Sequence, residues 1–351
     1  MAVTSRSSIR FFCCFTCALL AGSWLLSAKD NHDPGRGLSV YVHMNTSQNY
    51  PDVHPSVDVV VRTYVGDAHW LISCLRSIEH YGQIFRNVIV VFPNYEEHFF
   101  RSFLIDHRES SFGFKLDIIA VSEQEVLPNG YIQQTFSKLH TDLHSDADAF
   151  CFIDSDTILT RTIRWEDLYE GNQLLIRHVY WSEVDENHKT WKTKSEPAIG
   201  ISGNRSFMSN MGLLYPREAF HGVRQEVEKT QQKTLKEYYM SMVCPGQKES
   251  TSDPPAMPSE FELLGLWLSK FGDTSKIKFI HRDKDDKHAF AHSIKQSWSW
   301  GGYDPMKVIN NECHLRKAGN QCELLKSPCD IKTGTGCDRV QDARYPTCEV
   351  F

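Results

Sequence analysis

The chain has 351 residues, which is enough for one large domain or two ordinary ones. Its formal net charge is only -6, and its 38 Lys and Arg residues are interspersed with 44 Asp and Glu residues. Because such a chain lacks the basic patch with which nucleic-acid-binding proteins attract phosphate, we expect no nucleic-acid partner.

An uncharged apolar segment, FFCCFTCALLAGSWLLSA, covers residues 11–28 and follows Arg6 and Arg10. As a helix it is roughly 27 Å long, close to the thickness of the bilayer core. The basic residues before it favour a cytoplasmic tail over residues 1–10, so the pattern predicts a single-pass type II signal-anchor with the rest of the chain lumenal. A cleaved signal peptide is the alternative, although Leu26 and Ala28 make a poor cleavage site. Either way we expect the secretory pathway, as a Golgi or endoplasmic reticulum protein.

The eleven cysteines fit this oxidising compartment. Residues 311–351 contain few large apolar side chains but five cysteines, so we expect disulfides to hold this C-terminal segment together, with Cys244 as the candidate sixth partner. Cys74 and Cys151 lie in apolar runs and are predicted to be buried thiols. Sequons at Asn45 and Asn204 are compatible with a lumenal glycoprotein.

Residues 29–56 are mostly polar and are predicted to form a stem, and the pattern changes at Val57. Apolar runs then alternate with segments of helical period, which is typical of an α/β fold with a parallel sheet flanked by helices. The predicted strands are 58–64, 88–92, 116–121 and 149–153, and the predicted helices between them are 69–81, 95–105 and 131–143. Ligands of such sheets bind beyond the carboxyl ends of the strands. The sequence therefore predicts one α/β domain over residues 57–310 with its site at that edge.

The second half of this domain is less regular. The prediction there is a strand at 174–180, a polar loop through about residue 196, a strand at 211–215, a helix from residue 218, an exposed loop at 245–258, a helix at 259–271 and a strand at 276–280.

Asp154 and Asp156 follow the fourth predicted strand and are separated by Ser155. Two carboxylates at this spacing can converge on one hard divalent cation, which prefers oxygen ligands and also accepts phosphate oxygens. The alternative is that the tripeptide forms an ordinary turn at the end of a strand. Its position at a strand's carboxyl end favours the metal site.

This motif, with four other stretches, resembles the GT-A superfamily of glycosyltransferases, which carry D-x-D after a central strand. The similarity extends over about residues 57–285 and is greatest to a little-characterised branch of sugar transferases. The matching stretches are DVVVRTY, GYIQQTFSKL, DAFCFIDSDTILTR, SFMSNMGLLYPREAF and SEFELLGLW. The resemblance implies a GT-A-like Rossmann-type sheet and sugar transfer from a nucleotide-sugar, a UDP- or GDP-sugar, to a hydroxyl acceptor on a glycan, protein or lipid.

The resemblance also implies roles for individual residues. Asp154 and Asp156 would hold Mn²⁺ or Mg²⁺, which bridges the two donor phosphates, and Ser155 between them would border the donor. The residues that would contact the nucleotide or line the donor pocket are Arg62, Thr63, Gln133, Gln134 and Lys138. For each of these the alternative is a structural role, as a strand residue, an ion-pair partner of a surface acid or part of a solvated helix face.

Glu260 and Glu262 are the candidates for the carboxylate that accepts a proton from the acceptor hydroxyl or binds the acceptor. Ser259 and Glu262 also fit a capping box, in which the Glu262 carboxylate would bond the backbone amide of Ser259. Glu260 has no such specific alternative, apart from the general preference for acids in a first helical turn.

A histidine from the C-terminal part often completes the metal site in this superfamily. His281, His288 and His292 are the candidates, and His292 is the first choice because it lies nearest the aromatic run SWSWGGY. Trp298, Trp300 and Tyr303 in that run could stack on a sugar or pack in the core.

Two other classes stay open. Haloacid-dehalogenase-type phosphatases have D-x-D-x-T/V after an apolar strand, but Ile158 occupies the last position here and three strands are predicted to precede the motif. The Asp285–Asp286 pair could serve as their distal acidic motif. The third class is a lumenal nucleotide- or glycan-binding scaffold without turnover.

Overall fold

The computed structural model describes residues 54–109, 116–123, 127, 130–208, 212–242, 257–286 and 290–296. The predicted cytoplasmic tail, anchor, most of the stem, Cys244 and the cysteine-rich C-terminal segment lie outside these ranges. Among the described residues, no helix is long and apolar enough to span a bilayer.

The central sheet has five strands in the order β3-β2-β1-β4-β9. β1 (Val57–Arg62), β2 (Val88–Phe92), β3 (Ile118–Ser122) and β4 (Ala149–Phe152) are parallel, and β9 (Leu213–Pro216) pairs with β4 antiparallel. Nearly all their residues are buried, as continuous apolar runs in a sheet covered on both faces must be. The predicted α/β class with a mostly parallel sheet flanked by helices is confirmed.

The order in which the chain adds strands to the sheet reverses at β1 and β4, although these two strands are parallel. The chain adds β2 and then β3 on one side of β1, whereas β4 lies on the other side. Such a reversal opens a crevice at the carboxyl ends of the two central strands, which is where ligands of open α/β sheets bind.

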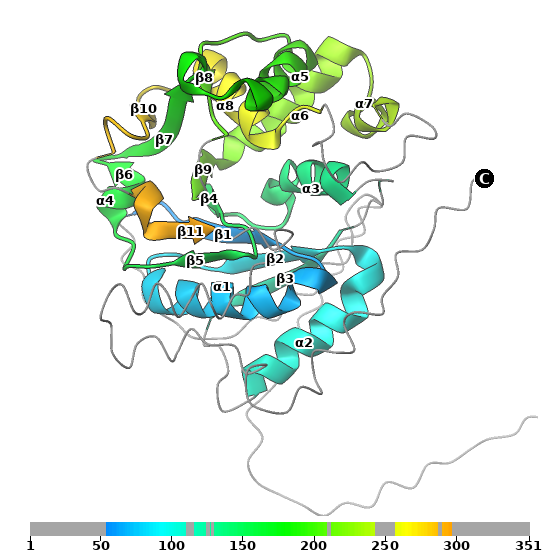
Figure 1. The fold of residues 1–351 in the computed structure, drawn as a ribbon, viewed down its shortest axis with the longest axis vertical. Helices are drawn as coiled ribbons and strands as arrows, with labels where there is room; N and C mark the ends of the chain where they lie inside the picture. The colour runs from blue at the N-terminus through cyan, green and yellow to red at the C-terminus, as the bar shows by residue number, and fades with distance from the viewer. Residues whose placement is uncertain are drawn as a thin grey trace, which may run out of the picture. The chain divides into compact units, whose positions relative to one another are not determined.

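Three helices connect these parallel strands, as predicted. They are α1 (Ala68–Tyr81), α2 (Glu97–Glu109) and α3 (Gly130–Lys138). The third is shorter than expected, because a 3-10 turn at Thr141–Leu143 replaces its last part. α1 and α2 lie together below the sheet in Figure 1, with α5, α6 and α8 on the far side of β4 and β9.

A second, smaller sheet has the order β10-β7-β6, with β8 on β7. The long β7 (Gln173–Tyr180) pairs with β10 (Ile277–His281) in parallel, and β6 (Tyr169–Glu170) and β8 (Arg205–Ser206) pair with it antiparallel. The predicted strands at 174–180 and 276–280 are confirmed within one residue.

The chain leaves β4 through the D-x-D turn into β5 (Thr157–Leu159), which pairs antiparallel with β11 (Ile294–Gln296). Figure 1 shows β11, in orange, beside β5. A segment from the end of the described chain is therefore placed next to the D-x-D motif.

Four of the remaining helices pack on one another: α5 (Lys189–Ile199), α6 (Arg217–Gln231), α7 (Leu235–Ser241) and α8 (Glu260–Phe271). The short α4 (Trp165–Leu168) packs on β6 and β7. The predicted polar loop through residue 196 is wrong in its second part, because α5 occupies it. That helix buries only a small face, Ser195, Ala198 and Ile199, against its neighbours, so its sequence carries little helical periodicity.

Glycine allows α8 to pack closely on two neighbours. A Cβ at Gly265 would lie 2.0 Å from Cγ of the buried Phe207, and a Cβ at Gly222 in α6 would lie 2.2 Å from the Trp267 ring of α8. Because real side-chain atoms do not approach this closely, only glycine permits these contacts.

Candidate active site

The D-x-D motif occupies a tight turn directly after β4. The Ile153 amide continues the pairing to β1 by donating to Val60 O at 3.0 Å, and the Thr157 amide donates to Asp154 O at 3.1 Å. Asp154 is partly exposed, whereas Asp156 is buried. The turn therefore presents two carboxylates at the carboxyl end of β4, which pairs with β1 in the centre of the sheet.

Lys138, at the end of α3, connects this turn to α8. Its Nζ lies 3.2 Å from Asp154 Oδ1 and 3.2 Å from Glu260 Oε1, and its side chain is only 3% exposed. Burial disfavours the charged ammonium, but the two neighbouring carboxylates outweigh burial and raise the pKa of Lys138. A positive charge is thus held between two acidic side chains.

Gln296, at the end of β11, bonds both carboxylates of the motif. Its Nε2 donates to Asp154 Oδ2 at 3.1 Å and to Asp156 Oδ1 at 3.3 Å. Gln296 was not predicted from the sequence, since β11 has only three residues and its pairing with β5 joins segments far apart in the chain. No local pattern marks it.

Glu260 lies in the first turn of α8, where Ser259 is the N-cap. The Ser259 Oγ accepts hydrogen bonds from the amides of Phe261 at 3.2 Å and Glu262 at 3.4 Å. The predicted capping serine is confirmed. The other half of the predicted capping box is wrong, because the Ser259 amide donates to Ser195 Oγ instead of the Glu262 carboxylate.

Glu262 is fully buried and supports β8 and the residues after it. Its Oε1 accepts hydrogen bonds from Ser206 Oγ at 2.6 Å and from the amides of Phe207 and Met208 at 3.0 Å each. Burial raises the pKa of Glu262 to about 7, and these three donors only partly oppose that rise. Its contacts are structural, and unlike Glu260 it has no ion pair with Lys138.

A second polar group lies at the carboxyl ends of β1 and β3. Arg62 Nε donates to Glu123 Oε1 at 3.2 Å, with the two side chains 8% and 2% exposed. The acid that pairs with Arg62 is therefore buried rather than on the surface. Thr63 is also buried. Near them the Val65 amide donates to Glu96 Oε2 at 2.8 Å, and burial raises the pKa of Glu96 to about 7.

Three further predicted residues are placed as follows. Ser155 is buried and its Oγ donates to Asp67 Oδ2 at 3.0 Å, so its side chain holds the turn against the start of α1. Gln133 is buried and its Oε1 accepts from the Leu127 amide at 2.6 Å. Gln134 is half-buried and lies one turn before Lys138 on the same face of α3.

Of the three predicted histidine ligands, only His281 has a described side chain, and it bonds Glu183 rather than the motif. His281 Nε2 bonds Glu183 Oε2 at 2.6 Å, and its Nδ1 accepts from the amides of Asp283 and Lys284 at 3.3 Å each. The backbone of His292 lies in the 3-10 turn Phe290–Ser293 just before β11, and its side chain is outside the described part. His288, Trp298, Trp300 and Tyr303 also lie outside the described residues.

Among the described residues, no group of three or more His, Cys, Asp or Glu side chains could bind a metal ion. The ligands available to a cation in this part of the chain are therefore the two carboxylates of Asp154 and Asp156. One nitrogen atom within 3.3 Å of oxygens from both Asp154 and Asp156 demonstrates that the two carboxylates converge on a single point. Two carboxylates with open positions left for phosphate oxygens and water suit Mg²⁺ or Mn²⁺.

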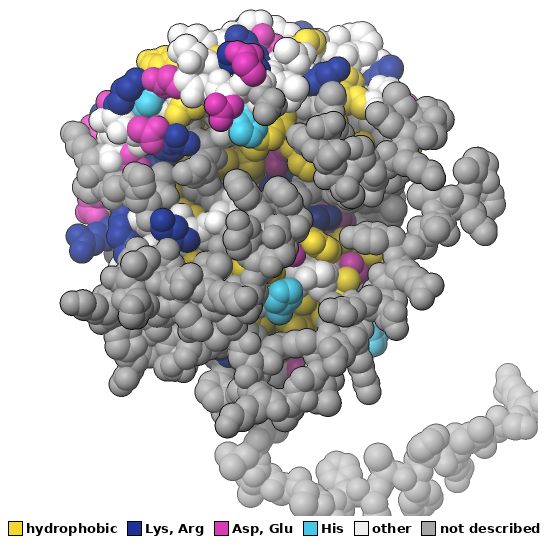
Figure 2. Space-filling model, in the orientation of Figure 1, with side chains coloured by type: hydrophobic (Ala, Val, Ile, Leu, Met, Phe, Trp, Pro, Cys, Tyr) yellow, Lys and Arg dark blue, Asp and Glu magenta, His cyan; other side chains and the backbone are white. Residues whose placement is uncertain are grey.

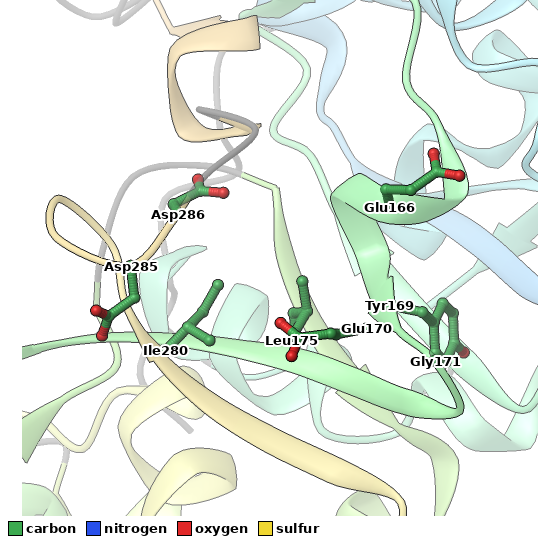
Figure 3. A pocket seen from close by; sticks show the side chains of 8 residues that line it. All are labelled: Glu166, Tyr169, Glu170, Gly171, Leu175, Ile280, Asp285 and Asp286. Atoms are coloured by element: carbon green, nitrogen blue, oxygen red, sulfur yellow. The ribbon is translucent and has the colours of Figure 1, made fainter.

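A separate hollow of about 170 Å³ lies on the smaller sheet, away from these residues. Figure 3 shows Glu166 and Tyr169 on one side of it and Ile280, Asp285 and Asp286 on the other. Asp286 pairs with the buried Arg177 at 3.2 Å, and Asp285 accepts from the His281 amide at 3.0 Å. These two acids, considered above as a phosphatase motif, thus have structural partners on the smaller sheet.

The face shown in Figure 2 intermixes acidic and basic side chains among its described residues. It has no extended field of one sign, which agrees with the mild net charge of the sequence.

Comparisons with known proteins give weak likenesses in structure alone. No protein-family model matches the sequence, and no curated protein matches it. Among solved structures, the chain is similar to the galactosyltransferase LgtC, crystallised with donor and acceptor sugar analogues. This match has 16% identity, 50% of this chain and 65% of LgtC covered, and a TM-score of 0.35.

The bifunctional glycosyltransferase WbbM matches at 12% identity over 52% of this chain and 38% of its own, with a TM-score of 0.32. The 4-diphosphocytidyl-2C-methyl-D-erythritol synthase of Anaerococcus prevotii matches at 10% identity over 75% of this chain and 96% of its own, with a TM-score of 0.35. The chain spans less than two thirds of either glycosyltransferase's length. Likenesses of this size establish no activity.

Proposed function

We propose that this protein is a metal-dependent glycosyltransferase that moves a sugar from a nucleotide-sugar to an acceptor hydroxyl. The observation that carries the proposal is the Lys138 ammonium, held 3.2 Å from both Asp154 of the D-x-D turn and Glu260 of α8. These groups meet at the carboxyl end of β4, next to the point between β1 and β4 where the strand order reverses. Sites with perturbed, convergent charges in such places are typical of catalysis.

Asp154 and Asp156 would hold Mn²⁺ or Mg²⁺ together with the donor diphosphate. The bound cation would neutralise the negative charge that accumulates on the diphosphate as the glycosidic bond breaks. The protein's own contribution is geometric, because the turn after β4 fixes both carboxylates before the donor arrives. Such preorganisation is the main source of electrostatic catalysis.

The nucleoside would extend from the diphosphate over β1 towards β3. Arg62 and Thr63 end β1, and Glu123 follows β3, so polar side chains line this edge. Gln134 and Lys138 approach from α3, where Lys138 would offer its third N–H to the donor sugar or diphosphate. A nucleotide laid across the strand ends would thus meet the residues that the sequence singled out.

Glu260 would be the carboxylate that acts on the acceptor. Its Oε1 is oriented by Lys138, and the start of α8 fixes its backbone through the Ser259 cap. A carboxylate so held can accept the proton of an attacking hydroxyl or bind an acceptor hydroxyl. Glu262 is the weaker candidate, because its carboxylate already bonds the residues after β8.

The proposal includes the cellular setting that the sequence predicts. The apolar residues 11–28 would anchor a lumenal domain in the Golgi or endoplasmic reticulum membrane. A change in the electrophoretic mobility of the C-terminal peptides on reduction would support this setting, because it would reveal disulfides. Removal of a glycan from Asn204 by a glycosidase would also support it. A chain with neither property would be placed outside the lumen.

Donor hydrolysis tests the activity without knowledge of the acceptor. The purified full-length protein is incubated with a panel of UDP- and GDP-sugars and Mn²⁺, and the released nucleoside diphosphate is measured. We expect release with one donor class, dependence on Mn²⁺, and loss in Asp156→Asn, whereas Lys295→Ala on the exposed side of β11 serves as the matched control. Binding without release would favour a binding protein, and release of inorganic phosphate from phosphomonoesters would favour a phosphatase.

A further inference from the structure

Gln296 has an unusual position relative to the D-x-D carboxylates. Its Nε2 lies 3.1 Å from Asp154 Oδ2 and 3.3 Å from Asp156 Oδ1, so one amide group is bonded to both. The other oxygen of Asp154 is bonded to Lys138. One oxygen of Asp154 and one oxygen of Asp156 thus point at the same nitrogen atom, the Nε2 of Gln296.

A divalent cation bound by the motif would need these same oxygens. Its ligands must be lone pairs, whereas the NH₂ group presents protons to that point. The present orientation of the Gln296 amide and a cation between the two carboxylates therefore exclude each other. Either the Gln296 side chain leaves or it turns.

Turning is favoured because the same amide also has a carbonyl oxygen. The terminal torsion of glutamine is broad and roughly two-fold, so a half-turn that exchanges Nε2 and Oε1 costs little. The neighbouring groups decide whether Nε2 or Oε1 of Gln296 faces the carboxylates. Without the cation these neighbours are hydrogen-bond acceptors, which favour Nε2, whereas a bound cation favours Oε1. The turned amide offers the hard oxygen ligand that Mn²⁺ and Mg²⁺ prefer.

The strand that carries Gln296 is held firmly, so the side chain can move without the backbone. β11 pairs with β5 from Ile294 to Gln296, and Ser293 O accepts from both the amide and the Oγ1 of Thr160, at 2.8 and 3.0 Å. Just before it, the Arg177 guanidinium lies 4.4 Å from the centre of the Phe290 ring. These contacts keep residue 296 at the motif in both states.

We propose that Gln296 is the third protein ligand of the cation. It holds the two carboxylates together through Nε2 in the absence of the ion and binds the ion through Oε1 when the ion is present. This inference rests on the proposed cation site of the transferase, and it assigns to Gln296 the place for which the sequence suggested His292.

The test is the affinity of the purified full-length protein for Mn²⁺ alone, measured by electron paramagnetic resonance of the free ion and by calorimetry, with no donor present. We expect Gln296→Ala to weaken Mn²⁺ binding by about ten-fold or more, in the range seen when groups that support metal ligands are removed. Gln296→Glu should bind Mn²⁺ more tightly than the wild type, since it replaces a neutral oxygen ligand with an anionic one. Lys295→Ala, at the neighbouring exposed position, should leave the affinity unchanged.

The opposite sign overturns the inference. If Gln296 only competes with the ion, Gln296→Ala removes the competitor and Mn²⁺ binds as tightly as before or more tightly. Equal thermal unfolding midpoints for Gln296→Ala and Lys295→Ala would exclude misfolding as the cause of a loss. A wild-type protein that binds no Mn²⁺, alone or with nucleoside diphosphate, would instead overturn the cation site itself and the Gln296 inference with it.

Discussion

The Lys138 Nζ and the Glu260 Oε1 lie 3.2 Å apart, although one residue ends α3 and the other begins α8. Both side chains are nearly completely buried, and the same ammonium reaches Asp154 at the D-x-D turn. One lysine therefore joins α3 and α8 to the proposed cation site.

Replacing Lys138 with methionine should cost both stability and activity. The substitution removes the ammonium group that pairs with Asp154 and Glu260, and the Glu260 carboxylate stays buried. We therefore expect a loss of about 3–5 kcal/mol in the free energy of unfolding. Urea unfolding measures it. Lys233→Met, which removes an exposed lysine, should change stability by less than about 0.5 kcal/mol.

The pair can be tested for direct coupling. In Lys138→Met/Glu260→Gln the unpaired buried charge is gone, so the double variant should be less destabilised than the sum of the single variants. Additive losses would show that Lys138 and Glu260 do not interact in solution.

Glu262 should make the protein less stable as pH rises. Its folded-state pKa is about 7, above the ordinary value of 4.5, so its contribution is fully present below about pH 4.5 and is lost as pH rises through 7. We expect the wild type to lose about 2 kcal/mol more than Glu262→Gln between pH 5 and pH 8. Unfolding by urea at both pH values measures the difference. The same pH dependence in both proteins would mean that Glu262 is ionised throughout.

Gly265→Ala should destabilise the contact between α8 and the residues after β8. The added methyl group would lie 2.0 Å from Phe207 Cγ, and the buried ring has little room to move, so we expect a loss of about 1–3 kcal/mol. Gly130→Ala is the control, since no atom lies within 4 Å of the new Cβ at the start of α3. Thermal unfolding should separate the two variants, and equal midpoints would contradict the packing described for α8.

Cys74 and Cys151 should be unreactive in the folded protein. Burial raises the pKa of both thiols, that of Cys151 to about 12, and nearby Asp156 and Asp154 raise that of Cys74 further. Iodoacetamide at pH 8 should label the two cysteine peptides only after unfolding, as read by mass spectrometry. Labelling of either peptide in native protein would show that the structure opens at α1, which contains Cys74, or at β4, which contains Cys151. The predicted buried thiols are confirmed by the structure.

The central sheet could be predicted from the sequence because its strands are buried on both faces and therefore form continuous apolar runs. β2 agrees with its prediction, and β1, β3 and β4 agree within two residues. β5 and β11 were missed, since three residues carry no pattern and their pairing is long-range. α5 was missed because tertiary packing, rather than an apolar stripe, holds it.

The candidate site could be predicted in part, because the D-x-D motif lies directly after an apolar strand. Asp154 and Asp156 were singled out by their position after a strand and Lys138 by the family resemblance, and the structure places Lys138 and Asp154 in contact. Gln296 has no local signal because only the fold brings it to the motif. The spacing of Ser259 and Glu262 fits a capping box. In the structure, however, the Glu262 carboxylate accepts hydrogen bonds from Ser206 and from the amide of Phe207, which are distant in the sequence. The roles of all these residues in transfer stay predictions.

The most direct test of the transferase is calorimetric titration of the full-length protein with UDP and GDP, with and without Mn²⁺, beside the Asp154→Ala/Asp156→Ala variant. We predict that one of the two nucleotides binds only with Mn²⁺ and that the variant loses this binding while it keeps its fold. Binding of neither nucleotide by folded wild-type protein, or binding that the variant retains, would contradict a donor site at the D-x-D turn.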